Sequence, residues 1–84
     1  MHSRHRATLR AMFAEPVPAS LEWAAIEALL VALGAEVTEG NGSRVRVVLG
    51  GVRAVFHRPH PQKEAKRYLV RDVRDYLKQA GFTP

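Results

Sequence analysis

Residues 44–57, RVRVVLGGVRAVFH, carry the clearest structural pattern in this chain. In 44–49, Val45, Val47 and Leu49 alternate with Arg44 and Arg46. In 52–57, Val52, Ala54 and Phe56 alternate with Arg53, Val55 and His57, and Gly50-Gly51 separates the two runs. An alternation of period two is typical of strands with one buried face, and a Gly-Gly pair suits a two-residue hairpin turn. The stretch therefore predicts an antiparallel hairpin with one apolar and one basic face. The basic face would present Arg44, Arg46, Arg53 and His57.

The segment before this hairpin predicts a helix and a third strand. Apolar residues recur at helical spacing over 21–33, with Ser20 as a candidate N-cap and Gly34 as a C-terminal stop. Residues 35–39 fit a short strand, and residues 40–43, GNGS, form a turn cluster. We therefore expect a three-stranded sheet that begins at this turn.

The segment after the hairpin divides into a loop and a second main helix. Pro59 and Pro61 have no N–H to donate, so the strand should end before them. The apolar stripe of the following helix consists of Leu69, Val73, Tyr76, Leu77 and Ala80. A second face, which we call the basic ridge, consists of Arg67, Arg71, Arg74 and Lys78. Gly81 should end the helix. The basic ridge could bind phosphate groups; the alternative is a solvated helix face on which Asp75 pairs with Arg71.

These elements predict an α+β fold, an α-β-β-β-α two-layer sandwich whose two main helices cover one face of the sheet. Residues 3–13 could add a short N-terminal helix capped by Ser3. We divide the chain into an N-terminal arm and linker, residues 1–19, and a domain of residues 20–84. A length of 84 residues allows one compact domain with a single core.

Composition and charge narrow the classes of function. The 46% of hydrophobic residues excludes intrinsic disorder, and the absence of cysteine excludes disulfides and thiolate chemistry. Residues 1–42 carry three Arg and five Glu, whereas residues 43–84 carry ten Lys or Arg and three acids. A cationic half of this kind favours polyanions such as nucleic acid, with plain solubility as the alternative. No apolar run has the length of a leader or a membrane span, so we expect a cytoplasmic protein without a membrane partner.

Two histidines are the candidate catalytic groups. His57 and His60 flank Arg58 and Pro59 at the end of the predicted hairpin. Cleavage of RNA without a metal needs a base for the 2′-hydroxyl, an acid for the departing 5′-oxygen and positive charge near phosphorus. Two imidazoles and an arginine are chemically sufficient, although purely structural roles for both histidines remain the alternative. No carboxylate lies between the two histidines, and the chain has no cysteine. We therefore expect no metal and no other cofactor.

Several cations and one turn could bind phosphate groups. Gly42 and Ser43 could bring backbone N–H groups close to an anion, because glycine has no side chain to hold it away. The strand arginines and the basic ridge come from the same cationic half of the chain. The candidate RNA-binding residues are Gly42, Ser43, Arg46, Arg53, Arg58, Arg67, Arg71, Arg74 and Lys78.

Four motifs in this order resemble HicA, the toxin of HicAB toxin–antitoxin pairs, over about residues 20–82. They are the helix end Leu33-Gly34-Ala35, Gly42-Ser43 before a strand, the Pro/His loop and the close Leu77-Lys78-Gln79-Ala80-Gly81-Phe82. The resemblance implies a fold like that of a double-stranded RNA-binding domain and growth arrest through mRNA cleavage. It also implies a HicB-type antitoxin that masks the RNA surface.

The chain departs from that family at one catalytic position. The family usually has a Gly-Ser-His motif at the start of the second strand, and Arg44 follows Gly42 and Ser43 here. The chain could be a ribonuclease that uses His57 or His60 with Arg44, a non-catalytic RNA-binding or antitoxin-binding module, or a protein with a decayed or engineered site.

A third class of function is DNA binding through the N-terminal helix. Arg4, Arg6 and Arg10 lie on that helix. It is too short to read a groove of DNA alone, so we rank this function below the other two.

Overall fold

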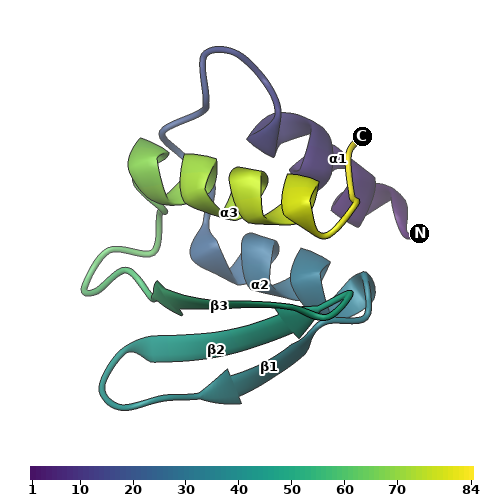
Figure 1. The fold of residues 1–84 in the computed structure, drawn as a ribbon. Helices are drawn as coiled ribbons and strands as arrows, with labels where there is room; N and C mark the ends of the chain where they lie inside the picture. The colour runs from purple at the N-terminus through teal and green to yellow at the C-terminus, as the bar shows by residue number, and fades with distance from the viewer.

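The computed structural model describes residues 1–84 and has the expected α+β architecture (Figure 1). Its elements are α1 (Ser3–Met12), α2 (Trp23–Ala32), β1 (Glu36–Glu39), β2 (Arg44–Leu49), β3 (Val52–His57) and α3 (Arg67–Gln79). The three strands form one antiparallel sheet in the order β1-β2-β3. From α2 onward the order α-β-β-β-α is that of a fold like the double-stranded RNA-binding domain. No helix has the length and apolar character needed to cross a membrane.

The central hairpin has the predicted register. Leu49 pairs with Val52 across the turn, and Arg44 pairs with His57 at the far end. Gly50 and Gly51 have φ angles of 58° and 78°, the left-handed conformation that a tight hairpin turn of this kind requires. Residues of β2 alternate strictly between exposed and buried, so the sheet has one inner and one outer face.

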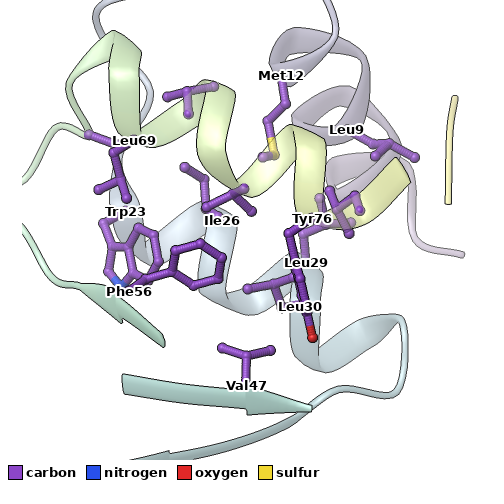
Figure 2. Packing of buried hydrophobic residues seen from close by; sticks show 14 of the residues in the cluster. Leu9, Met12, Trp23, Ile26, Leu29, Leu30, Val47, Phe56, Leu69 and Tyr76 are labelled. Atoms are coloured by element: carbon purple, nitrogen blue, oxygen red, sulfur yellow. The ribbon is translucent and has the colours of Figure 1, made fainter. Parts of the chain in front are cut away.

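The core lies between the inner face of the sheet and the helices (Figure 2). The indole of Trp23 and the rings of Phe56 and Tyr76 pack in sequence, with centroid distances of 6.2 and 5.6 Å. Tilted and edge-on contacts of this kind are the favoured arrangements of aromatic pairs. The hydroxyl of Tyr76 donates to the carbonyl oxygen of Val52 at 2.7 Å, which fastens α3 to β3.

Helix α1 is present as predicted and shares this core. Leu9 and Met12 of α1 and Val17 of the following linker are 4%, 0% and 2% exposed. Figures 1 and 2 show α1 beside α3, with Met12 directed into the space between the helices. The prediction that Ser3 caps α1 was wrong, because His2 holds that position and its Nδ1 accepts from the N–H of Arg4 at 3.2 Å. The N-terminal segment is therefore packed against the domain along its apolar side.

Helix α2 begins at Trp23, two residues later than predicted. The N–H of Trp23 donates to the carbonyl oxygen of Lys63 at 2.9 Å, and the N–H of Ala65 donates to that of Leu21 at 2.8 Å. These bonds hold residues 21 and 22 extended against the segment that precedes α3. Glu22, not Ser20, is the N-cap, and its side chain makes no capping bond. The pairing fixes the path of the loop between β3 and α3.

Candidate nucleic-acid interface

The outer face of the sheet is cationic and carries no helix (Figure 1). Its exposed side chains on β2 and β3, which we call the open face, are Arg44, Arg46, Val48, Arg53, Val55 and His57. The register places Arg46 opposite Val55 and Val48 opposite Arg53, so arginines and valines intermix across the two strands. Thr38 and Glu36 extend the face onto β1, where Glu36 is its one acidic group. The face offers three guanidinium groups to a polyanion.

The structure brings two of the three candidate catalytic residues together. Arg44 and His57 are direct partners across the β2–β3 pair, both exposed on the open face. His57 and His60 line a pocket of about 200 Å³ at the end of β3, so the second histidine lies within the same hollow. The pocket also contains Gln62, Lys66 and Tyr68, which sequence reasoning missed. The pocket therefore gathers two imidazoles and the Lys66 side chain at the end of β3 where Arg44 lies opposite His57.

Gly42 and Ser43 lie in the turn that enters β2. Gly42 has a φ angle of 64°, a conformation that strains other residues. The carbonyl oxygen of Ser43 accepts a hydrogen bond from the N–H of Arg58 at 2.9 Å. This bond ties the turn to the residue that follows His57, so Gly42 and Ser43 support the candidate catalytic end of the sheet.

Arg58 points to the other side of the sheet from its neighbour His57. Its guanidinium contacts the Glu27 carboxylate of α2 at 3.1 Å and the Glu39 carboxylate of β1 at 2.7 Å. Two carboxylates thus engage a side chain that the sequence offered as a phosphate ligand. The contacts join three segments far apart in the chain, and we assign Arg58 the role of holding the start of the loop that carries His60.

The basic ridge of α3 lies away from the open face, since α3 packs on the inner side of the sheet (Figure 1). Three of its four residues contact the linker after α1. Arg67 donates to the carbonyl oxygen of Val17 at 2.9 Å, and Arg74 contacts the Glu15 carboxylate at 2.8 Å. The Lys78 ammonium lies 6.0 Å from the centroid of Phe13. Arg71 is exposed, and Asp75 lies 3.8 Å from Arg74 and makes no ion pair with Arg71. The structure therefore separates the ridge from the strand arginines.

The ion pairs of Arg58 shift the pKa of Glu27 and the pKa of Arg58 itself. Hydrogen bonds from Arg58 hold the pKa of Glu27 below its ordinary value of 4.5, against the opposing effect of burial. The Trp23 Nε1 donates to Glu27 at 2.8 Å and lowers the pKa of this carboxyl further. The bonds to Glu27 and Glu39 raise the pKa of Arg58, so the guanidinium stays charged.

The lowered pKa of Glu27 predicts a loss of stability in acid. Because the folded pKa is below 4.5, the contribution of this carboxylate is complete above that pH and is lost as the pH falls through the folded pKa. Urea unfolding of the wild type at a series of pH values should show this decline in the free energy of unfolding. Glu27→Gln should flatten it, while Glu36→Gln, which removes an exposed carboxylate from the sheet, should not. Equal pH profiles for wild type and Glu27→Gln would contradict the assignment.

A sheet backed by α2 and α3, with its other face open, defines the class of α-β-β-β-α domains. The family model described as the HicA toxin of bacterial toxin–antitoxin systems matches residues 23–82. The chain belongs to the HicA toxin family, which confirms the resemblance drawn from its motifs, and membership implies a cognate antitoxin as partner. Searches of curated proteins and of solved structures gave no significant match. The match begins at the first residue of α2, so α1 lies outside it.

Proposed function

We propose that the protein is an RNA-binding toxin that cleaves mRNA by metal-independent acid–base catalysis. The observation that carries the proposal is the position of His57, which lies opposite Arg44 at one end of a cationic open face and lines one pocket with His60. The strand arginines would hold the phosphates on either side of the scissile bond. A HicB-type antitoxin bound to the open face would prevent RNA from reaching these residues.

The chemistry needs only the groups at this site. One imidazole of His57 and His60 would take the proton of the 2′-hydroxyl, whose oxygen then attacks phosphorus. The other would give a proton to the departing 5′-oxygen as the P–O5′ bond breaks, leaving a 2′,3′-cyclic phosphate and a free 5′-hydroxyl. Arg44, opposite His57, would stabilise the charge that develops on the phosphorane oxygens. The second candidate function is RNA or antitoxin binding without cleavage, which the arginine at the family's usual histidine position favours.

Binding of RNA to the open face can be measured through its salt dependence. Arg46→Ala with Arg53→Ala should weaken the binding of single-stranded RNA and reduce the slope of log K against log salt by about 0.7 for each lost contact. Arg6→Ala with Arg10→Ala is the matched control, because it removes the same charge from exposed positions of α1. An equal loss in both double variants would mean that net charge alone drives binding. A larger loss in the α1 variant would favour the N-terminal helix instead.

A further inference from the structure

Tyr68 is the only exposed side chain among the six Phe, Trp and Tyr residues. It is 58% exposed at the second position of α3, while the adjacent Leu69 and Val70 are buried. The ring therefore lies beside the apolar face of α3 and is not part of it. A single exposed aromatic ring is ordinary on a protein surface, so its surroundings decide whether it has a function.

The surroundings of Tyr68 are those of a nucleic-acid site. The ring lines the same pocket as His57 and His60, the two proposed catalytic groups. Lys66, at the N-cap of α3, and Gln62 line that pocket too, and both are exposed. The ring thus lies among a cation that can hold a phosphate, an amide that can bond a base edge, and two imidazoles. An aromatic ring beside such groups is the usual platform for a nucleobase.

We propose that Tyr68 stacks on an unpaired nucleobase of the RNA and so directs the protein to single-stranded RNA. The inference rests on the proposed function, because it specifies that the RNA bound at the same site is single-stranded. Bases inside a duplex stack on one another and present only their edges, so a ring in this pocket has no base face to contact in a duplex. The stacked base places a neighbouring phosphate at His57 and His60, while the strand arginines bind the rest of the backbone.

The preference for single strands runs against the simplest expectation from the fold. A domain like the double-stranded RNA-binding domain would suggest binding of a duplex through its shape and phosphates. The helix face that carries the basic ridge is partly occupied by the linker, since Arg67 and Arg74 contact Val17 and Glu15. On the open face, Arg46 donates to the carbonyl oxygen of Glu39 at 3.5 Å, and none of the three strand arginines makes an ion pair. A flexible single strand can follow this face and the pocket of Tyr68.

The test compares one sequence in two states. Wild type, Tyr68→Ala and Tyr68→Phe are titrated with a short 2′-O-methyl RNA that carries 2-aminopurine, alone or annealed to its complement. The 2′-O-methyl group removes the nucleophile, so binding is measured without cleavage, and the fluorescence of 2-aminopurine falls when the base stacks. Tyr68→Ala should weaken single-strand binding about tenfold, that is about 1.4 kcal/mol, and reduce the quenching. Tyr68→Phe should bind as the wild type does, and duplex binding should be equal in all three.

The outcomes separate this inference from the proposed function. Suppose that Tyr68→Ala binds the single strand with the affinity of the wild type, while Arg46→Ala with Arg53→Ala binds it weakly. The stacking inference is then wrong, but binding of RNA to the open face is supported. Stronger binding of the duplex than of the single strand by the wild type also overturns the inference. If the wild type binds neither RNA, the proposed function itself fails. Val31→Ala, at a 57% exposed position of α2, controls for the loss of an exposed apolar side chain.

Discussion

Removal of residues 1–19 should unfold the domain. The deletion takes away Leu9, Met12 and Val17, all nearly or fully buried in the shared core. Burial of an apolar side chain of this size contributes about 1.5 to 3 kcal/mol. The three together thus contribute about 5 kcal/mol or more, as much as the whole stability of many small domains. The deletion also leaves Arg67 and Arg74 without their partners in the linker.

Urea unfolding followed by circular dichroism measures this effect. Met12→Ala gives a graded version, because it should cost about 2 to 5 kcal/mol without removing α1. Arg6→Ala, at an exposed position of the same helix, should leave the unfolding midpoint nearly unchanged. A truncated chain with the wild-type midpoint would show that α1 is a dispensable arm.

The hairpin and the two main helices were predictable because the apolar residues of each recur at a regular spacing. Alternation in 44–49 and 52–57 around Gly50-Gly51 fixed the hairpin and its register. The same register explains why Arg44 and His57 lie opposite each other. The apolar stripe of 67–79 likewise determined which face of α3 is buried, and Gly81 marked its end.

The packing of α1 and the start of α2 were not predictable from periodicity. A short amphipathic helix shows which of its sides is apolar but not which surface it covers. Similarly, Leu21 and Glu22 continue the helical pattern of α2, but their backbones pair with residues 63–65, a contact distant in sequence. Tertiary hydrogen bonds outweighed local preference at this position.

In the candidate site, the pair of histidines was predictable from the sequence, whereas contacts between distant segments were not. His57 and His60 are close in sequence, so their proximity follows from the short loop. The approach of Tyr68 and Lys66 to them depends on the path of residues 58–66, which no repeating pattern encodes. The capture of Arg58 by Glu27 and Glu39 depends on three separate elements. One available signal for Tyr68 was an aromatic residue placed outside the apolar stripe of its helix.

Replacing both histidines should abolish cleavage while leaving RNA binding intact. A positioned acid or base typically contributes about 10²- to 10⁴-fold to the rate, so His57→Ala with His60→Ala removes most of the proposed catalysis. Both side chains are exposed, so the fold should tolerate the change. Binding should persist because the strand arginines remain.

Arg44→His is the informative companion variant. It places a histidine where the family usually has one, opposite His57 on the open face. If the native chain cleaves through His57 and His60 with Arg44 stabilising the phosphorane, the wild type should already cleave and Arg44→His should not raise the rate. If the native chain only binds RNA, cleavage should appear in this variant alone.

The most direct measurement is incubation of purified, partner-free protein with a labelled mRNA in the presence of EDTA. The wild type, the double histidine variant, Arg44→His and the control Arg6→Ala are compared, with products resolved by length and end chemistry. We expect cleavage by the wild type and by Arg6→Ala, ends with a cyclic phosphate and a free 5′-hydroxyl, and no cleavage by the double variant. Cleavage by the double variant at the wild-type rate, or cleavage by Arg44→His alone, would contradict the proposed catalytic role of His57 and His60.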